Sequence, residues 1–257
     1  MQDSDSEKPV EKMKETVRQT GKAEIASPPT RRYRTLLFQT ALISAIIAFA
    51  TLTFLVETIP SFSVDLQITR AIQTIDSPLF AEVMRLVSWP GFLPQSIIIT
   101  LLIAFVLYMY GLRWEAGASL LAAAVSAVTN ELVKNLIQRP RPTADFVDVF
   151  SVLQSYSFPS GHVMFYIAFL GFVWYLAYTL LERSLLRGFL LGFFGSLVLL
   201  IGVSRIYLGH HWASDVVGAY LLGGLALMGI ILFHQWGKKR FSVHQSVARH
   251  SERNKHV

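Results

Sequence analysis

The chain has 257 residues, of which 53% are hydrophobic and only 16% are charged, and its formal net charge is +6. A soluble domain usually carries about 25% charged residues, so a soluble all-helical core is disfavoured because the apolar runs leave too little polar surface. The sequence contains no cysteine, which excludes thiol catalysis, disulfides and thiolate metal sites.

The N-terminal part of the chain is polar and basic. Residues 1–30 mix Lys, Glu, Ser, Pro and Thr, a composition typical of disordered segments. The last residues of the chain are basic again. We therefore predict a disordered cytoplasmic tail over residues 1–34, a membrane domain over residues 35–236 and a basic cytoplasmic tail over residues 237–257.

Six runs of predominantly apolar residues lie between the tails: Leu36–Val56, Leu93–Tyr110, Ala116–Val133, Val163–Leu181, Gly188–Val203 and Val216–Phe233. About 20 apolar residues span the hydrocarbon core of a bilayer as a helix. In lipid the backbone must satisfy its own hydrogen bonds, which helices do. The sequence therefore predicts an all-α fold, an integral membrane bundle of six transmembrane helices.

The longest link, Glu57–Phe92, follows the first run. It contains two segments with apolar residues at helical spacing and charges on the other side, which predict short amphipathic helices along the membrane surface. Ser77 and Pro78 are typical of an N-cap followed by a proline at the first helical position. Trp89-Pro90-Gly91 interrupts the chain before the second run.

The basic residues predict the orientation of the helices. Lys and Arg cluster before the first run and after the last, and the short links Gly111–Glu115 and Glu182–Arg187 also carry arginine. The positive-inside rule places these segments in the cytoplasm, which requires an even number of spans. We interpret the basic tails as topology determinants that also contact anionic lipid headgroups, in preference to segments that bind nucleic acid.

Besides Glu57–Phe92, two further links are expected to lie on the outer side. The first opens with "RPRP"; a residue before proline is driven out of the α region, so the third helix should end near Gln138. In the second, Gly209 suits the left-handed position after a helix. The sixth helix should begin near Asp215.

Polar residues gather at the predicted outer ends of four runs. They are Lys134, Arg139 and Arg141 after the third run, Ser160, Gly161 and His162 before the fourth, Arg205 after the fifth, and His211 and Asp215 before the sixth. Each has an ordinary structural interpretation; His211 and Asp215, for instance, form an i,i+4 pair. Together they indicate a functional site, because charges at membrane depth are costly and usually mark function.

This set of groups suits phosphate chemistry. Arginine and lysine bind phosphate dianions, and a hydroxyl and an amide near a helix start add donors. A neutral histidine is a nucleophile toward phosphorus when an acceptor holds its other ring nitrogen, and a second histidine can protonate the leaving oxygen. The sequence has no outer cluster of carboxylates for magnesium or zinc, so we predict a metal-independent reaction without a cofactor.

The pattern resembles the type 2 phosphatidic acid phosphatase family of integral membrane lipid phosphatases. The family signature is Lys, six residues, Arg-Pro; then Pro-Ser-Gly-His; then Ser-Arg, five residues, His, three residues, Asp. In this sequence the three parts are Lys134 to Pro142, Pro159 to His162, and Ser204 to Asp215, in order and without a gap. The resemblance covers the chain from about Leu36 to Trp236.

The resemblance implies a role for each signature residue. His211 would attack phosphorus and form a phosphohistidine, Asp215 would orient His211, and His162 would protonate the leaving group and then activate water. The phosphate oxygens would be held by Lys134, Arg141, Ser160, Gly161 and Arg205. Arg139 and His210 lie outside the signature.

The resemblance also implies a lipid phosphate substrate, handled at the outer face of the cell membrane. Phosphatidic acid, phosphatidylglycerol phosphate and undecaprenyl diphosphate are the candidates. Two alternatives stay open: a lipid phosphotransferase that uses an acceptor alcohol, and a non-catalytic lipid-binding or transport protein. The sequence does not determine the oligomeric state.

Overall fold

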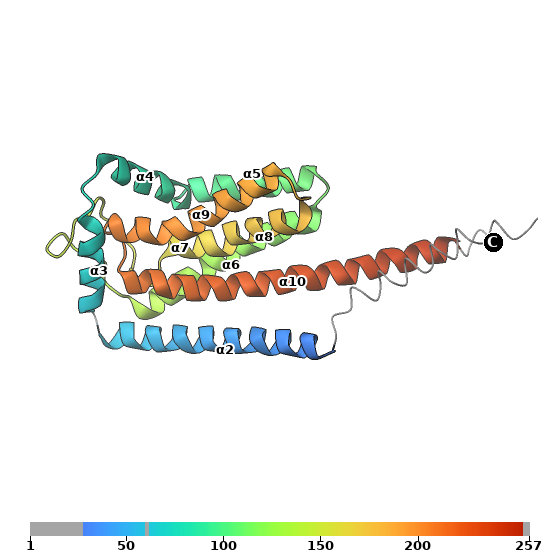
Figure 1. Cartoon of the computed structure of the whole chain (residues 1–257), viewed down its shortest axis with the longest axis horizontal. Helices are drawn as coiled ribbons and strands as arrows, with labels where there is room; N and C mark the ends of the chain where they lie inside the picture. The colour runs from blue at the N-terminus through green and yellow to red at the C-terminus, as the bar shows by residue number, and fades with distance from the viewer. Residues whose placement is uncertain (1–27, 60–61, 254–257) are drawn as a thin grey trace, which may run out of the picture. The chain divides into compact units, whose positions relative to one another are not determined.

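The computed structural model describes residues 28–59 and 62–253, which form helices and links without a strand. The chain divides into two compact units, residues 1–44 and 45–257. Helix α2 (Pro28–Thr58) runs from the first unit into the second (Figure 1). Most of the predicted N-terminal tail, residues 1–27, lies outside the described residues.

The rest of the second unit is built from short and long helices in sequence: α3 (Ser63–Gln73), α4 (Pro78–Ser88), the 3₁₀ turn η1 (Trp89–Gly91), α5 (Gln95–Met109), α6 (Arg113–Ile137), α7 (Gly161–Phe165), the π segment η2 (Tyr166–Leu170), α8 (Gly171–Leu180), α9 (Leu185–Tyr207) and α10 (Ala213–Arg253). The predicted all-α class is confirmed. Two predicted boundaries differ: α2 begins at Pro28, within the segment expected to be disordered, and α10 continues through residue 237 to Arg253.

Among the residues that the structure describes, five helical stretches are long and apolar enough to cross a membrane: Thr35–Thr58, Arg113–Ile137, Gly161–Leu180, Leu185–Tyr207 and Ala213–Arg240. A sixth candidate is the pair α4–η1 and α5, which bends by 63° at the break between them. Helix α5 alone has 15 residues, about 22 Å at 1.5 Å per residue, which is shorter than a typical hydrocarbon core. The count of five to six agrees with the multi-pass prediction, and the predicted second span is the short one.

The two amphipathic helices predicted in the first long link are α3 and α4. The Ser77 hydroxyl accepts from the backbone N–H of Phe80 at 3.4 Å, and Pro78 occupies the first turn, so the predicted cap is present. Leu79 and Leu86 leave 75% and 63% of their surface exposed. An apolar face of this kind is typical of a helix that lies against lipid.

The predicted helix ends are also found. Helix α6 ends at Ile137, and Gln138 takes the left-handed conformation with φ 51° while its N–H donates to Lys134 O. Gly209 follows α9 with φ +67°, and a Cβ there would lie 2.1 Å from the carbonyl oxygen of Asp148. Only glycine satisfies both conditions, so this turn depends on Gly209.

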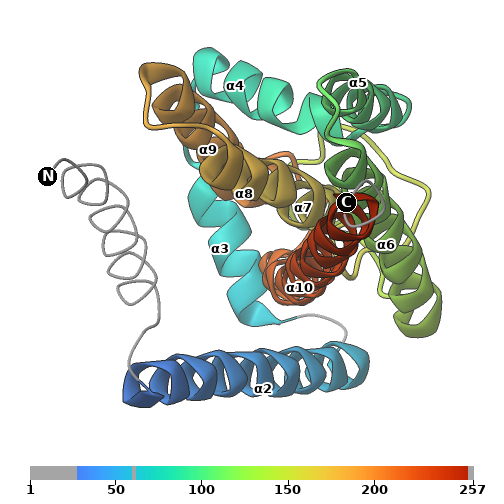
Figure 2. The ribbon, with the colours of Figure 1, turned by 90° about the vertical axis from the view of Figure 1, so that its right-hand side faces the viewer.

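The stretch α7–η2–α8 lies in the middle of the helices α6, α9 and α10 (Figure 2). In its most apolar part, 56% of the residues are buried, whereas the share is 28% in the corresponding parts of α9 and of α10. Residues Tyr166–Leu170 form a π-helical segment. The sequence does not reveal it, because a single π turn leaves the spacing of apolar residues close to that of an α-helix. Such segments are common near functional sites.

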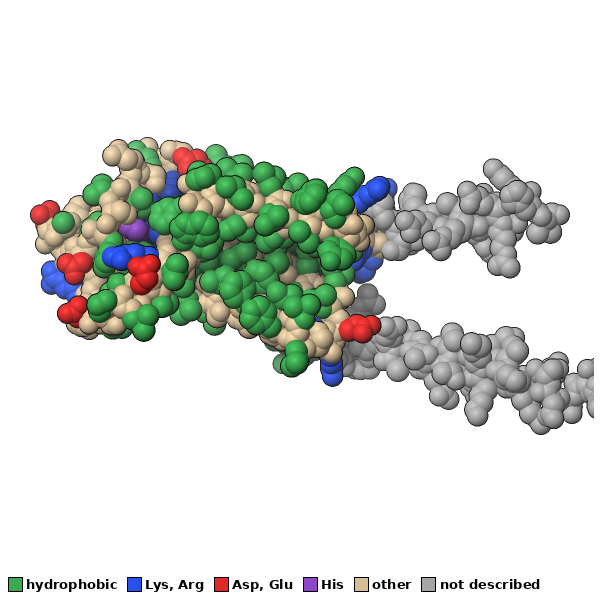
Figure 3. Space-filling model, turned by 90° about the horizontal axis from the view of Figure 1, so that it is seen from above, with side chains coloured by type: hydrophobic (Ala, Val, Ile, Leu, Met, Phe, Trp, Pro, Cys, Tyr) green, Lys and Arg blue, Asp and Glu red, His purple; other side chains and the backbone are tan. Residues whose placement is uncertain are grey.

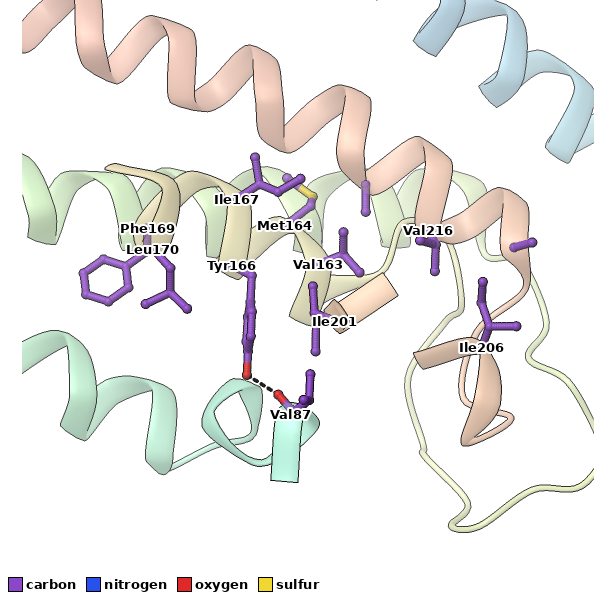
Figure 4. Packing of buried hydrophobic residues seen from close by; sticks show 12 residues of the cluster. Val87, Val163, Met164, Tyr166, Ile167, Phe169, Leu170, Ile201, Ile206 and Val216 are labelled. Carbon is purple, nitrogen blue, oxygen red and sulfur yellow. Dashed lines mark hydrogen bonds between the residues drawn. The ribbon is translucent and has the colours of Figure 1, made fainter. Parts of the chain in front are cut away.

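The hydrophobic core surrounds this central stretch. Val163, Met164, Tyr166 and Ile201 are fully or almost fully buried, and the hydroxyl of Tyr166 donates to the carbonyl oxygen of Val87 (Figure 4). By contrast, hydrophobic side chains cover the visible flank of the molecule, while charged side chains gather toward its ends (Figure 3). This distribution is that of a membrane bundle, whose polar groups lie near the interfaces.

Replacing Tyr166 by Phe should lower the stability of the bundle. The substitution keeps the ring and removes the donor, which leaves the buried carbonyl of Val87 without it, at a cost of about 1–3 kcal/mol. Thermal unfolding in detergent measures the change. Tyr178→Phe is the matched control, because Tyr178 is 53% exposed; equal losses in both variants would contradict the assignment.

Candidate active site

His211 and Asp215 form the centre of the site. His211 lies in the turn before α10, and its Nδ1 is 3.5 Å from Oδ2 of Asp215 in the first turn of α10. Its Nε2 lies 3.1 Å from Nη1 of Arg141. A guanidinium has only donors, so Nε2 carries the lone pair and Nδ1 carries the proton; Nδ1 makes no hydrogen bond among the described residues, the Asp215 carboxylate being 3.5 Å away. The contact with Arg141 therefore favours the tautomer that a nitrogen nucleophile requires.

Arg141 is fixed by the loop that contains it. Its Nε donates to Ser155 O at 2.6 Å and its Nη2 to Ser155 Oγ at 2.9 Å, while Nη1 donates to His210 O at 2.6 Å. Lys134, near the end of α6, reaches the same hydroxyl with Nζ at 3.4 Å from Ser155 Oγ. Ser155 thus holds two of the predicted phosphate-binding cations side by side.

Arg205 lies in the last turn of α9 and is completely buried. Its Nη1 donates to Ser88 Oγ at 2.5 Å, and its guanidinium carbon lies 5.3 Å from the centre of the Phe92 ring. Nε and Nη2 have no hydrogen-bond partner among the described residues. A buried guanidinium with two unused donors is a strong anion-binding group.

The Pro159–His162 turn precedes the central stretch. Asn130 of α6 donates to Pro159 O at 2.9 Å, and a Cβ at Gly161 would lie 3.0 Å from Oδ1 of Asn130. The N–H of Ser160 donates to Asp215 O at 3.3 Å, which ties this turn to α10. In the part of the chain that the structure covers, Ser160 Oγ and His162 Nε2 are buried without a partner.

Phe92 connects the histidine of this turn with the arginine of α9. Its ring lies edge-on to His162, with centroids 4.4 Å apart, and beneath the Arg205 guanidinium. Gly91 must stay small, because a Cβ there would lie 2.4 Å from Cδ2 of His162. All the residues selected from the sequence therefore meet at one end of the bundle: Lys134, Arg141, Ser160, Gly161, His162, Arg205, His211 and Asp215.

The electrostatics favour a neutral His211. Burial lowers the pKa of His211 well below its usual range, and the positive charges of Arg141, Arg205 and Lys134 lower it further. Burial also lowers the pKa of Arg141 to about 10, so that guanidinium remains charged at neutral pH. The site thus pairs an unprotonated imidazole nitrogen with fixed cations.

His210 does not compete with His211 for Asp215. Its Nε2 lies 2.8 Å from Ser151 Oγ, in the loop after α6. Burial, with Arg205 and Arg141, lowers the pKa of His210 to about 3. His211, four positions before Asp215, is therefore the imidazole that faces this carboxylate.

Several residues of the site were not selected from the sequence. Arg139 belongs to the polar residues that gather at the helix ends but lies outside the signature, and its Nη1 donates to Asp215 Oδ1 at 2.5 Å. Asp65, Asn130 and Phe92 gave no local signal at all, because their roles arise from packing between distant segments. Only the "RPRP" repeat, which sets Arg139 in the same extended conformation as Arg141, drew attention to one of them.

The donor set does not suit a metal ion. Among the residues that the structure describes, no three His, Cys, Asp or Glu side chains are placed to bind one. The carboxylate of Asp215 is engaged by Arg139, Ser157 and the N–H of Trp212. The cations around His211 would repel a divalent cation and attract an anion.

Comparison with known proteins finds similar sequences. The model of the PAP2 superfamily matches residues 115–240. Phosphatidylglycerophosphatase B of Bacillus subtilis is 29% identical over 185 residues, which cover 70% of this chain and 88% of that protein. An undecaprenyl-diphosphatase of Sulfolobus acidocaldarius is 34% identical over 103 residues, which cover 38% of this chain and 45% of that protein.

Two solved structures are similar. The transmembrane PAP2-type phosphatidylglycerolphosphate phosphatase of Bacillus subtilis superposes with a TM-score of 0.67 and 27% identity, covering 76% of this chain and 96% of that one. Aquifex aeolicus LpxE superposes with a TM-score of 0.52 and 23% identity, covering 67% of this chain and 98% of that one. The second likeness concerns the fold alone.

Replacing His210 by Gln should make stability less dependent on pH. Its pKa is about 3 in the folded protein and about 6.5 when unfolded, so the unfolded chain binds a proton that the folded one does not. Neutral, buried His210 therefore contributes to the free energy of unfolding in full above about pH 6.5. As the pH falls from about 6.5 toward 3, this stability is lost by up to about 1.4 kcal/mol per pH unit. The melting temperature of His210→Gln in detergent should therefore fall less between about pH 7.5 and 5 than that of the wild type.

Ser151→Ala is the control for this comparison. It removes the contact with His210 Nε2 but leaves the buried imidazole and its two arginine neighbours. It should keep the pH dependence of the wild type. The same pH dependence in His210→Gln and wild type would show that folding does not lower the pKa of His210.

Proposed function

The chain belongs to the PAP2 superfamily, and from this premise we propose that His211 and the groups around it remove phosphate from membrane lipids through a phosphohistidine intermediate. Its homologues are phosphatases of lipid phosphates, and its apolar helices make it a multi-pass membrane protein. The enzyme is thus a membrane lipid phosphatase. The proposal concerns its mechanism, its sidedness and its substrate.

One observation carries the mechanism. Buried polar atoms without partners in the described chain belong to residues around the neutral His211: Arg205 Nε and Nη2, Ser160 Oγ and His162 Nε2. Burying such groups is costly unless they bind something, and a phosphate supplies acceptor oxygens for all of them. Arg141 and Lys134 would complete this group of phosphate-binding residues, which we call the phosphate cradle.

In the first step, Nε2 of His211 attacks phosphorus. The N–P bond forms as the P–O bond to the leaving group breaks, and His162 gives its proton to the leaving oxygen. Asp215 stabilises the positive charge that develops on His211, 3.5 Å from Nδ1. The negative charge of the bound phosphate favours the protonated form of His162 before this step.

In the second step, neutral His162 takes a proton from water, whose oxygen attacks phosphorus. The N–P bond breaks, its electron pair returns to Nε2 of His211, and inorganic phosphate leaves. His162 ends protonated and ready for the next cycle. The cationic cradle provides the charge stabilisation that metals supply in other phosphatases, so we propose that no metal takes part.

The substrate is proposed from the relatives. The relative matched over most of its own length, at 88%, is a phosphatidylglycerophosphatase, which makes phosphatidylglycerol phosphate the first candidate. Undecaprenyl diphosphate is the second, because the matched undecaprenyl-diphosphatase is more identical over a shorter segment. Phosphatidic acid presents the same terminal phosphate and completes the substrate panel.

The site is proposed to face the outside of the cell membrane, with both termini in the cytoplasm. The ends of the helices opposite to the site carry the basic residues Arg113, Arg183, Arg187, Lys238, Lys239 and Arg240. The positive-inside rule places such ends in the cytoplasm.

Purified protein in detergent should release inorganic phosphate from phosphatidylglycerol phosphate, undecaprenyl diphosphate or phosphatidic acid in the presence of excess chelator. His211→Ala should lower turnover to the level of the uncatalysed reaction, because it removes the nucleophile, while His210→Ala should keep most of it. Phosphate release is followed colorimetrically.

Three results would contradict parts of the proposal. Activity lost on chelation would refute the metal-free mechanism, and a reversed effect of the two histidine variants would move the nucleophile to His210. Transfer of phosphate to an added alcohol, without release of inorganic phosphate, would identify a phosphotransferase. No activity on any of the three lipids would refute the proposed substrates.

Single cysteines test the sidedness, because the chain has none of its own. Gln154→Cys lies in the exposed loop at the site end, and Arg183→Cys lies in the exposed link between α8 and α9. An impermeant thiol reagent added to intact cells should label the first variant and should label the second only after lysis. The opposite pattern would place the site in the cytoplasm.

A further inference from the structure

Arg139 bridges two buried carboxylates that lie far apart in the sequence. Its Nη1 donates to Asp215 Oδ1 at 2.5 Å, and its Nη2 donates to Asp65 Oδ2 at 2.9 Å. The three side chains are 4% exposed or less. Breaking one contact of such a group leaves an uncompensated charge away from water, so the three act together.

The backbone around Arg139 is fixed independently of its side chain. Gln138 before it is left-handed and Pro140 follows it, which keeps Arg139 extended. Its carbonyl oxygen accepts from the N–H of Ser157 at 2.8 Å. The guanidinium is therefore delivered to one place by a rigid turn.

The two oxygens of Asp215 have separate tasks. Oδ1 is taken by Arg139, while Oδ2 accepts from the hydroxyl of Ser157 and from the N–H of Trp212 at 2.9 Å. Oδ2 is also the oxygen that faces Nδ1 of His211. Because Arg139 holds the opposite oxygen, it fixes the rotation of the carboxylate that presents Oδ2 to the imidazole.

Asp65 of α3 holds this arrangement from the other side. Its Oδ1 accepts from the N–H of Ser214 at 2.8 Å, and its Oδ2 accepts from the Ser214 hydroxyl at 2.6 Å. Ser214 is the residue before Asp215, and its hydroxyl also accepts from Arg139 Nη1 at 2.7 Å. Asp65 thus forms hydrogen bonds both with the first turn of α10 and with the arginine that binds Asp215.

From these contacts we infer that Arg139 and Asp65 are positioning residues, which hold the Asp215 carboxylate in register with His211. In the part of the chain that the structure describes, neither side chain bonds to a proposed phosphate-binding residue; both act through Asp215. The inference rests on the proposed function, in which His211 becomes a cation during the phosphohistidine step. It also gives α3 a place in the enzyme, because the helix contributes Asp65 to this bridge.

Single and double variants, which differ in the net charge left in the buried bridge, separate an effect on kcat from an effect on protein stability. Arg139→Gln should lower kcat by about 10- to 100-fold, the scale found for groups that orient metal-binding histidines and carboxylates, with KM within about 3-fold of wild type. Arg139→Lys should recover part of kcat, because the charge remains. Asp65→Asn, which keeps the shape of the side chain, should lower kcat less and leave KM unchanged.

The double variant Arg139→Gln/Asp65→Asn decides between the two roles. It removes one buried cation and one buried anion, so its melting temperature in detergent should return toward that of the wild type. Its kcat should remain as low as that of Arg139→Gln, because Asp215 has still lost its partner. A kcat that recovers together with the melting temperature would overturn the inference, since that is the behaviour of a purely structural bridge.

Two controls keep the interpretation separate from the proposed function. Arg85→Gln breaks an exposed ion pair with Glu82 on α4 and should leave kcat, KM and melting temperature unchanged. Wild-type protein that hydrolyses none of the three lipid phosphates would refute the proposed function. Active wild type with unchanged kcat in both folded Asp65→Asn and Arg139→Gln would refute only the positioning role.

Discussion

A chain of buried polar contacts with alternating charge organises the site end of this bundle. Asp65 and Asp215 lie on either side of Arg139 at 2.9 and 2.5 Å, and His211 stands between Asp215 and the guanidinium of Arg141. Water cannot stabilise these groups where they lie, so each depends on its neighbours. The start of α10, the loop after α6 and helix α3 can therefore occupy only positions that preserve the sequence of contacts.

The site is made of helix ends for local reasons. Helix α6 stops because Gln138 turns left-handed before an Arg-Pro pair, and α9 stops at a glycine whose φ is positive. At these ends the chain leaves the helix, so loop carbonyls such as Ser155 O and His210 O are available to hold Arg141. A helix interior offers no such acceptors, which explains why the cradle forms where the apolar runs stop.

The parts of this arrangement that depend on short-range pattern were predictable. The lengths of the apolar runs predicted the helices. The positions of the polar residues between Lys134 and Asp215 predicted a cluster, and these residues do lie at one end of the bundle. The Arg139–Asp65 bridge was not predictable, because its partners are 74 positions apart and α3 looked like any amphipathic surface helix. Phe92 escaped notice for the same reason: an aromatic residue after a proline-glycine break has no signature until packing sets it against His162.

Charge balance supports the proposal that the site binds the phosphate and not the lipid tail. Lys134, Arg141 and Arg205 bring positive charge to the cradle, while the carboxylate of Asp215 is already committed to Arg139. A phosphate dianion supplies the missing negative charge and the acceptors that Arg205 lacks. The contacts proposed to hold the phosphate all lie at the end of the bundle. The acyl or prenyl chain can therefore stay in the bilayer, with no free-energy cost of moving it into the protein. Selectivity among lipids must then come from the groups next to the phosphate, within reach of the loop after α6.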